Sequence, residues 1–485
     1  MTRKAALAVL AVLSLVGCST PRPRAEQFAT EVSQRVGADA MYGHLKQLQK
    51  IADDNGGNRA FGTPGYDASV RYVADLLRSK GFDVDTTDLE IPVAFADPPK
   101  LTVGGSPVAA EPLRYTQGTP PAGITTRLVP VVRGDGLGCQ VSDYDGLWVS
   151  GAVVLVNRGT CSFAVKETNA AARGAAALIV VNNVDGDAAN GTLGQRTAVQ
   201  IPVVGVSKAD GIRIRANPGP VTLTLNAGVR KEHTRNVIAQ TRTGSTHDVV
   251  TVGAHLDSVK EGPGINDNGS GVAAVLETAL QMGSSPPVRN AVRFAFWSAE
   301  ESGVLGSKRY VESLDVEALK DIALYLNFDM IASPNPGYFT YDGDQSGPVP
   351  AEGKVPRVPE GSAGIERTLV AYLDRTAKKA EDTEFDGRSD YDTFTEAGIP
   401  AGGLFSGAER PMTDGQAQRW GGVAGQPFDP NYHKKSDTVD RIDHTALEIL
   451  GRGVAFAVAS YSQDLDGRNG VPQRQDRTRH TVQPS

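Results

Sequence analysis

The sequence is poor in several residue types and patterns that would place it in a specialised class of protein. Of its 485 residues, three are cysteine, three are tryptophan and five are methionine. Apart from Cys18 near the N-terminus only two cysteines remain, and two cysteines alone do not indicate a zinc finger. The sequence has no run of Lys or Arg that could follow a phosphate backbone, and its net charge is −7. Nucleic acid is therefore not an expected partner.

What is present is the composition of a globular protein. Hydrophobic residues make up 40% of the chain and charged residues 22%, which is typical neither of a disordered nor of a membrane-spanning protein. The length is too great for one ordinary hydrophobic core, so we expect two or three domains. We find no internal repeat.

The N-terminus departs from this globular pattern. Two basic residues precede an apolar run, Ala5 to Val16, that is shorter than the roughly 20 residues needed to cross a bilayer. The run is typical of a secretory signal peptide, here residues 1–17. It ends in Leu15–Cys18, which resembles a bacterial lipobox, so we expect export and anchoring in the cell membrane through lipidated Cys18, with release as a further outcome. The alternative is an ordinary signal peptide with a chance cysteine. Residues 18–26 are polar and predict a linker.

The two other cysteines are Cys139 and Cys161. An exported protein lies in an oxidising compartment, which favours a disulfide bond between them. The alternative is a pair of free, buried thiols.

The pattern along the chain divides it into further segments. Residues 27–94 are helical and then extended, and residues 95–232 have fewer charges, many glycines and short strand-like runs. In residues 233–465 predicted strands and helices alternate, which indicates an α/β sheet. We therefore predict an α/β protein with an inserted β-rich domain. Residues 466–485 are polar and predict a disordered tail.

The predicted elements of the α/β part are short and regularly spaced. The predicted strands are Asn236–Gln240, Val249–Ala254, Ala291–Trp297, Ala323–Asn327 and Ala401–Leu404. The predicted helices are Tyr66–Lys80, Gly271–Met282, Gly303–Leu314, Gly364–Lys379 and Ala446–Ser462.

Candidate metal ligands lie just past the ends of these strands, where open α/β sheets bind their ligands. His255 and Asp257 follow the strand Val249–Ala254. Residues two apart on an extended backbone point to the same side, so His255 could bind a metal while Asp257 orients a neighbouring ligand. A histidine and an aspartate at this spacing are common by chance and are weak evidence alone.

Three further carboxylates follow the same rule. Asp267 lies in the glycine-rich segment Gly264–Gly271, where its two oxygens could bridge two cations; alternatively it caps the next helix. Glu300 and Glu301 follow the strand Ala291–Trp297, so one could bind a metal while the other acts as a general base. The alternative is a pair of acids favoured by a helix N-terminus.

Asp329 and His433 complete the set. Asp329 follows a strand that we expect to be buried, where an unpaired carboxylate is costly. A lone histidine in a loop, like His433, is usually only exposed. Together with the residues above it makes two histidines, two aspartates and a glutamate, a mixture that suits catalytic zinc with an open position for water. Magnesium and calcium normally use no histidine.

These motifs, in this order, resemble peptidase family M28, the co-catalytic zinc aminopeptidases. The stretches Phe385–Tyr391 and Gly398–Glu409 are similar to the secreted Streptomyces-type aminopeptidases, which prefer large apolar N-terminal residues. The resemblance covers about residues 25–91 and 235–465. It implies a zinc-exopeptidase sheet flanked by helices and an enzyme that removes the N-terminal residue of peptides with a free N-terminus.

The resemblance also implies a role for each residue. Two zinc ions would be bound by the five ligands, with Asp267 bridging; His255 is paired first with Glu301 and Asp329 with His433, but the pairing stays open. Glu300 would be the general base, and Tyr432 would donate a hydrogen bond to the oxyanion. Arg388 would place the N-terminus of the substrate; the alternative is a surface salt bridge. Phe405 would line the pocket for the substrate side chain; the alternative is ordinary core packing.

One departure concerns the loop that carries Tyr432 and His433. Relatives have cysteines at the positions of Asn431 and Ser436, so we expect this loop to lack a disulfide and to be more mobile. The inserted domain, through Gly159–Phe163 and Ile201–Val204, resembles a protease-associated domain, which in related peptidases covers the active site and limits access.

Three other functions remain open at this point. Carboxypeptidases and glutaminyl cyclases share this fold. A catalytically inactive, receptor-like relative would have lost ligands, and none is lost in this sequence. The third alternative is a peptide-binding lipoprotein in which the inserted domain does the binding.

Overall fold

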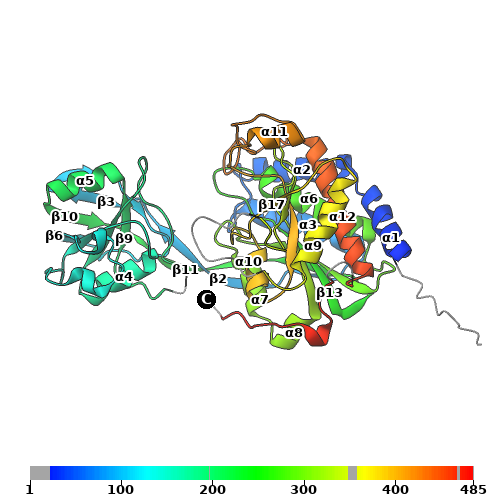
Figure 1. Ribbon diagram of the computed structural model, residues 1–485, viewed down its shortest axis with the longest axis horizontal. Helices are drawn as coiled ribbons and strands as arrows, with labels where there is room; N and C mark the ends of the chain where they lie inside the picture. Colours follow the sequence, from blue (N-terminus) through cyan, green and yellow to red (C-terminus); the bar gives the residue numbers. More distant parts are fainter. Residues whose placement is uncertain (1–21, 196, 348–357, 467–469, 484–485) are drawn as a thin grey trace, which may run out of the picture. The chain divides into compact units, whose positions relative to one another are not determined.

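The computed structural model describes residues 22–195, 197–347, 358–466 and 470–483. The expected signal peptide and Cys18 lie outside these residues. The chain forms two compact units (Figure 1). One unit contains the described residues up to Thr87 together with Arg235–Val482, and the other contains Asp88–Thr234 and Gln483. The prediction of an α/β protein with an inserted β-rich domain is confirmed, and each unit is described by itself below.

The first unit is built on an eight-stranded sheet with the order β1-β12-β14-β13-β15-β18-β16-β17. Its strands are β1 (Val84–Asp85), β12 (Val237–Gln240), β13 (Ser245–His255), β14 (Asn290–Trp297), β15 (Ile322–Phe328), β16 (Phe339–Tyr341), β17 (Glu381–Thr383) and β18 (Ala401–Phe405). The four central strands β14, β13, β15 and β18 are parallel. Parallel strands are covered on both faces, which explains their nearly continuous apolar sequences.

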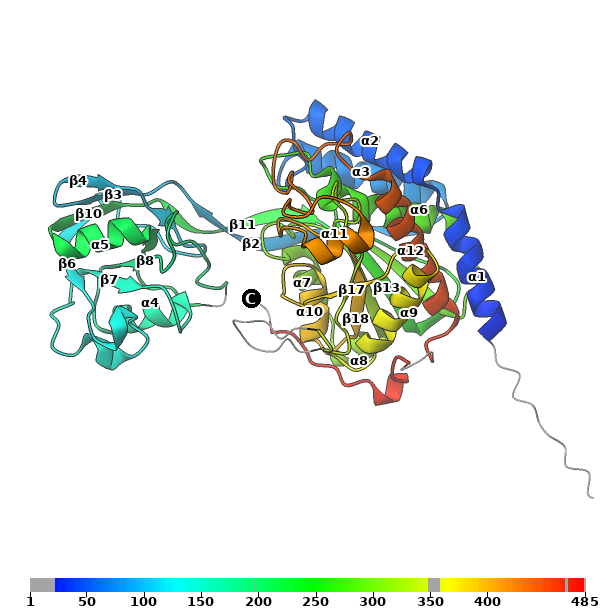
Figure 2. The same ribbon diagram turned by 45° about the horizontal axis from the view of Figure 1, so that its top comes forward.

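Helices cover both faces of this sheet (Figure 2). Along β14, Phe294 and Phe296 pack in one apolar cluster, while Ala295 and Trp297 pack in another. The first cluster includes side chains of α1 (Arg22–Arg35), α2 (Ala38–Asp54), α3 (Pro64–Ser79), α6 (Gly271–Met282), α9 (Ser362–Asp374) and α12 (His444–Gln463). The second includes side chains of α7 (Leu305–Glu312), α8 (Val316–Asp321) and α10 (Tyr391–Glu396). A short helix, α11 (Asp414–Trp420), precedes the loop that leads to α12.

The predicted elements are present with small shifts at their ends. The prediction for α6 has the observed bounds, and the five predicted strands correspond to β12, β13, β14, β15 and β18. The helix predicted from Gly303 begins only at Leu305. Ala299 and Val304 have φ near +53°, so the backbone turns sharply between them before the helix starts. Glu300 and Glu301 therefore lie on a turn.

Two expectations about polar segments near the chain ends are wrong. Helix α1 begins at Arg22, so the last five residues of the expected linker 18–26 are helical. Ala29 and Val32 on this helix are buried, as is Val36 just after it, and α1 packs along α12. The packing against α12 stabilises the helix, although the polar residues at its N-terminal end by themselves predict a linker.

The second wrong expectation is the disordered tail from residue 466. Residues 470–482 belong to the first unit, where Arg477 and Arg479 are buried. Arg479 donates hydrogen bonds to the carbonyl groups of Leu319 and Ile322 at 3.2 and 3.0 Å. The segment is held mainly by guanidinium–carbonyl hydrogen bonds, and a polar composition does not reveal such contacts.

The second unit contains a sheet with the order β4-β3-β10-β6-β7-β8-β9-β5. Its strands are β3 (Lys100–Val103), β4 (Ser106–Val108), β5 (Glu111–Pro112), β6 (Ile124–Pro130), β7 (Val153–Asn157), β8 (Ala177–Val181), β9 (Val203–Val206) and β10 (Pro220–Thr224). Helices α4 (Phe163–Ala172) and α5 (Lys208–Ala216) pack on it. The strands β2 (Asp88–Ala96) and β11 (Ala227–Arg235) form a separate two-stranded sheet, so this unit extends beyond the expected range 95–232.

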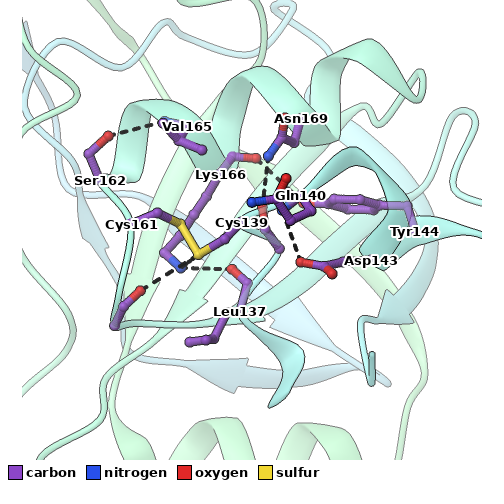
Figure 3. The surroundings of a disulfide bond; sticks show 12 residues. Leu137, Cys139, Gln140, Asp143, Tyr144, Cys161, Ser162, Val165, Lys166 and Asn169 are labelled. Carbon is purple, nitrogen blue, oxygen red and sulfur yellow. Dashed lines mark hydrogen bonds between the residues drawn. A yellow bond between two sulfur atoms is a disulfide. The ribbon is translucent and has the colours of Figure 1, made fainter. Parts of the chain in front are cut away.

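Cys139 and Cys161 form a disulfide bond in this unit, with their sulfur atoms 2.05 Å apart (Figure 3). The buried side chain of Lys166 lies beside it, with Nζ donating to the carbonyl group of Leu137 at 2.7 Å and lying 3.6 Å from Sγ of Cys139. Burial lowers the pKa of Lys166 to about 8.

Among the described residues of both units, no helix has both the length and the hydrophobicity that crossing a bilayer would need.

Candidate metal centre

Three neighbouring parallel strands deliver most of the candidate ligands to one edge of the sheet. His255 is the last residue of β13, Asp329 directly follows β15, and Glu300 and Glu301 lie on the turn after β14. Because the carboxyl ends of parallel strands meet at the same edge, these side chains converge. Asp267 comes from the helical turn η3 (Ile265–Ser270) before α6. It does not cap α6, whose N-cap is Ser270.

The five predicted ligands gather in two groups that share Asp267. Nε2 of His255 lies 3.2 Å from Oδ1 of Asp267 and 3.3 Å from Oδ1 of Asp329. Nε2 of His433 lies 3.2 Å from Oδ2 of Asp267 and 3.1 Å from Oε2 of Glu301. Asp267 thus offers one oxygen to each group, as a bridging ligand must.

This grouping differs from the pairing that the sequence resemblance first suggests. His255 lies with Asp329, and His433 lies with Glu301. Strand order alone does not decide this grouping, because β13 lies between β15 and β14 in the sheet. On the turn after β14, Oε2 of Glu300 lies 4.0 Å from Nε2 of His255, while Oε2 of Glu301 lies 3.1 Å from Nε2 of His433. Such a grouping cannot be read from the order of motifs along the chain.

The chemistry of the group fits divalent cations bound by nitrogen and oxygen. Oε1 of Glu301 and Oδ1 of Asp329 are buried without a hydrogen-bond donor. Burial, together with repulsion from Asp267, raises the pKa of Glu301 to about 7. Burial would lower the pKa of His433, but its hydrogen bonds to Asp267 and Glu301 raise it to about 10. Buried carboxylates this close together need positive charge between them, and imidazole with carboxylate is a donor set that zinc accepts.

Residues behind the ligands orient them. The backbone N–H of Glu300 donates to Oδ1 of Asp257 at 3.1 Å, and that oxygen lies 3.7 Å from Nδ1 of His255. The side chain of Asp257 is fully buried, and its backbone carbonyl oxygen lies 3.1 Å from Nδ1 of His255, so residue 257 contacts the ligand from outside the cluster. Oγ of Ser389 donates to Oδ2 of Asp329 at 2.7 Å. Ser389 was not predicted as a site residue, although it lies within the similar stretch Phe385–Tyr391.

Glu300 lies beside the cluster without belonging to either group. Its Oε2 atom is 4.0 Å from Nε2 of His255. Burial raises the pKa of Glu300 well above its usual value, and repulsion from Glu301 and Asp329 acts in the same direction. A carboxylate with a raised pKa next to a metal centre has the property that a general base requires.

Tyr432 and Arg388 form a connected pair at the cleft. Nη2 of Arg388 donates to the hydroxyl of Tyr432 at 3.1 Å, and Nη1 donates to Oε1 of Glu409 at 2.9 Å. The ring of Tyr432 stacks on His433 with ring centroids 3.8 Å apart. Because the hydroxyl accepts a bond from Arg388, its own hydrogen is free to be donated to another group.

The cluster opens into a cavity of about 660 Å³. The five candidate ligands, Glu300, Arg388 and Tyr432 line it, and so do the phenylalanines Phe339, Phe405 and Phe428. The ring of Phe405 lies 6.0 Å from that of Phe339, and the side chain is only partly buried. An aromatic wall beside a polar cluster is typical of a site that holds an apolar side chain next to reacting groups.

Both units match known protein families. Residues 236–458 match Peptidase family M28, and residues 124–214 match the PA domain. The first match contains all five gathered ligands, Glu300 and Tyr432.

The similarity to individual proteins covers almost the whole chain. The chain is 62% identical over 460 residues to the probable lipoprotein aminopeptidase LpqL of Mycobacterium tuberculosis, and the match covers 95% of this chain and 92% of that protein. It is 42% identical over 432 residues to an aminopeptidase of Pseudomonas aeruginosa, covering 86% and 79% of the two chains.

Solved structures with the same architecture are also known. An aminopeptidase from Aneurinibacillus sp. strain AM-1 matches with a TM-score of 0.73 at 27% identity, covering 92% of this chain and 98% of that one. BSAP, a zinc aminopeptidase from Bacillus subtilis, matches with a TM-score of 0.63 at 25% identity, covering 90% and 98%.

The grouping of ligands can be tested with two double variants. Glu301→Ala with His433→Ala removes ligands from one group only, so this variant should retain close to one bound cation per chain. Asp329→Ala with His433→Ala removes a ligand from each group and should retain less than the first variant. Metal analysis after gel filtration in metal-free buffer measures both. Equal retention, or the reverse order, would contradict the grouping.

Proposed function

The chain is a member of peptidase family M28, and from that premise we propose that it is an exported zinc aminopeptidase that uses two zinc ions and Glu300 as general base. The observation that carries the proposal is the pair of ligand groups sharing Asp267, with Glu300 and an aromatic wall beside them in one cavity. The relatives with the same two units are named as aminopeptidases, which supports this activity over the carboxypeptidase and cyclase alternatives.

The two zinc ions would be held by the two groups, one by His255 and Asp329, the other by Glu301 and His433, with Asp267 common to both. When bound, zinc lowers the pKa of a water ligand to about 7 and polarises the substrate carbonyl group. Retention of all five ligands argues against a catalytically inactive relative. It also argues against a function in peptide binding by the inserted domain alone.

The chain's own groups perform the proton transfers. Glu300 accepts a proton from the attacking water and delivers it to the leaving amine. Its position 4.0 Å from His255 keeps it close to the reacting atoms without making it a ligand. The hydroxyl of Tyr432 donates to the oxyanion, and Arg388, itself held by Glu409, keeps that hydroxyl in place.

The substrate is a peptide with a free N-terminus. An α-amino group has a pKa of about 7.7–8.0, so it is largely cationic at neutral pH and suits a cavity lined by carboxylates. This supports an exopeptidase. Arg388, as a cation, does not suit a direct contact with that amine, so we assign it to Tyr432. The side chain of the first residue would lie against Phe405, which favours large apolar residues such as leucine.

The proposed location follows from the N-terminus of the chain. Leu15–Cys18 has the pattern of a lipobox, and the M. tuberculosis relative is named as a lipoprotein. We place the enzyme on the outer side of the cell membrane, anchored through acyl chains on Cys18, where an oxidising environment also permits the Cys139–Cys161 disulfide bond.

Replacing Glu300 tests the mechanism. The variant Glu300→Ala should keep its zinc and lose activity by a factor of about 10²–10⁴, because general-base catalysis contributes an effect of that size. Hydrolysis of Leu-p-nitroanilide and zinc content are measured on the same sample. The cleft acid Glu384, which pairs with Arg410, provides the matched control, and Glu384→Ala should keep kcat near that of the wild type.

The same assay tests the activity itself. A chelator should abolish hydrolysis by the wild type, and added zinc should restore it. A zinc-loaded wild type that cleaves neither Leu- nor Lys-p-nitroanilide would refute the aminopeptidase proposal, and a Glu300→Ala variant as active as the wild type would refute the assignment of the base.

Replacing Phe405 tests the side-chain pocket. Phe405→Ala should lower the preference for Leu- over Ala-p-nitroanilide, measured as the ratio of kcat/KM values, by at least about tenfold, because an apolar wall of the pocket is lost. Phe456→Ala removes an aromatic ring that packs on Tyr372 away from the cavity, so it should cost stability and leave the ratio unchanged. An unaltered ratio in Phe405→Ala would assign this residue to core packing.

Replacing Cys18 tests the anchor. The wild type, expressed in a bacterium that processes lipoproteins, should incorporate a labelled fatty acid and partition into the detergent phase of Triton X-114. Cys18→Ser should incorporate no label and partition into the aqueous phase, because the thiol that forms the thioether is missing. Equal partitioning of the two proteins would favour an ordinary signal peptide.

A further inference from the structure

The segment between β13 and α6 carries the shared ligand Asp267, and we call residues 256–268 the bridging loop. Apart from residues 259–261 it is buried. It has no regular secondary structure before residue 265, so sheet hydrogen bonds do not satisfy its backbone groups. Buried backbone groups need partners, and the partners in this loop come from two distant charged side chains.

The first is Arg59, which lies on the loop before α3 and is completely buried. Its Nε atom donates to the carbonyl group of Pro263 at 2.9 Å and Nη2 to that of Gly264 at 2.6 Å. Nη1 donates to the carbonyl group of Leu256. The guanidinium therefore binds three carbonyl groups of the bridging loop, on both sides of its exposed tip.

The second is Asp437, four residues after the ligand His433 and only 3% exposed. Oδ1 accepts a hydrogen bond from the backbone N–H of Asn266 at 2.7 Å, and Oδ2 accepts one from the backbone N–H of Asp267 at 3.0 Å. The carboxylate thus holds the backbone of the shared ligand itself. It also joins the loop that carries Tyr432 and His433 to the bridging loop.

A second aspartate adds to the contact between the two loops. Oδ2 of Asp429 accepts from the side-chain amide of Asn266 at 2.7 Å. The loop with Tyr432 and His433 is therefore tied to the bridging loop on both sides, by Asp429 before the pair and Asp437 after it. These buried bonds restrain the loop although Asn431 and Ser436 cannot form a disulfide within it.

The two loops also approach each other without spare room. A Cβ atom on Gly262 would lie 2.1 Å from the carbonyl oxygen of Lys434. Within the bridging loop itself, a Cβ atom on Gly264, whose φ is +62°, would lie 2.3 Å from the carbonyl oxygen of Asp267. A shift of either loop would break several of these contacts together.

Arg59 and Asp437 have opposite charges, and they bind opposite ends of the peptide dipoles in the bridging loop. The cation binds carbonyl oxygens, and the anion binds N–H groups, so the peptide dipoles between them are aligned with the field of both charges. The two charges also attract each other directly. Each buried charge is stabilised by the loop that it holds.

We propose that Arg59 and Asp437 are positioning residues of the metal centre, which hold the bridging loop in its binding conformation before any cation enters. Asp267 can then present one oxygen to each ligand group without a rearrangement. The inference rests on the proposed function in one respect, the role of Asp267 as the ligand shared by two zinc ions.

The test uses the full chain with the variants Arg59→Gln and Asp437→Asn. In the metal-free protein, hydrogen exchange of the backbone amides in residues 262–268 should be at least about tenfold faster than in the wild type, because local opening becomes easier. Zinc affinity, measured by competition with a chromophoric chelator, should fall by about 10–100-fold, the usual effect of losing a residue that orients ligands. Arg59→Lys, which keeps the charge and a donor, should recover part of both losses.

Two controls make the same kinds of contact away from the metal centre. Arg479, also buried, donates to carbonyl groups of Leu319 and Ile322, and Glu167, fully buried in the other unit, accepts from the N–H groups of Gln200 and Ile201. Arg479→Gln and Glu167→Gln should lower thermal stability without changing exchange in residues 262–268 or zinc affinity. If these controls weaken zinc binding as much as the test variants do, the effect is general destabilisation and the proposal is wrong.

The double variant Arg59→Gln with Asp437→Asn separates joint from independent action. Because both residues hold one loop, the loss of zinc affinity should be smaller than the product of the two single losses. Losses that multiply, or single variants with wild-type exchange and affinity, would overturn the proposal. A single variant that fails to fold is replaced by Arg59→Lys, whose smaller losses must again appear in both measurements.

The outcome is distinguishable from a failure of the proposed function. If the wild type binds zinc but hydrolyses no aminoacyl substrate, the aminopeptidase proposal fails while the exchange and affinity measurements still test the positioning role. If the wild type is active and the variants exchange and bind as it does, only the positioning role fails.

Discussion

The structure of this enzyme depends on collecting several carboxylates in a space of a few ångströms at one edge of a buried sheet. Asp267, Glu300, Glu301 and Asp329 surround His255 and His433, and burial raises the pKa of nearby Asp390 to about 7. Such crowding is unfavourable unless cations lie between the carboxylates. A zinc ion bound between these carboxylates would therefore also stabilise this edge of the sheet, because it would offset their mutual repulsion.

The scaffold meets this demand in two ways. Parallel strands bring three ligands to one edge: His255 ends β13, Asp329 directly follows β15, and Glu301 lies on the turn after β14. Asp267 and His433 lie on loops that no strand supports. Buried charges make up for this, because Arg59 binds carbonyl groups and Asp437 binds N–H groups of the same segment. Hydrogen bonds to backbone dipoles, in addition to apolar packing, thus keep the candidate ligands in position relative to one another.

The agreement between sequence and structure is closest where a pattern is local. Apolar runs predict β13, β14, β15 and β18 because a buried parallel strand needs apolar residues on both faces. The polar tail and the linker were mispredicted because their partners are distant in sequence. Arg479 binds carbonyl groups of residues 319 and 322, and Ala29 and Val32 pack on a helix at the other end of the chain. Ser389 went unnoticed for the same reason, since its role is a bond to Asp329.

The sequence by itself determined the fold class, the family and the identity of the five residues that gather, because each of these follows from residue types and their spacing along one strand or turn. Only the tertiary structure decided which ligands lie together. His255 lies with Asp329, and Glu301 lies with His433 although the strands before His255 and Glu301 are neighbours, so neither chain order nor strand order alone predicts the grouping. The tertiary structure also shows that Asp429 and Asp437 hold the loop with Tyr432 and His433 through hydrogen bonds between segments about 170 residues apart, which leave no trace in local sequence.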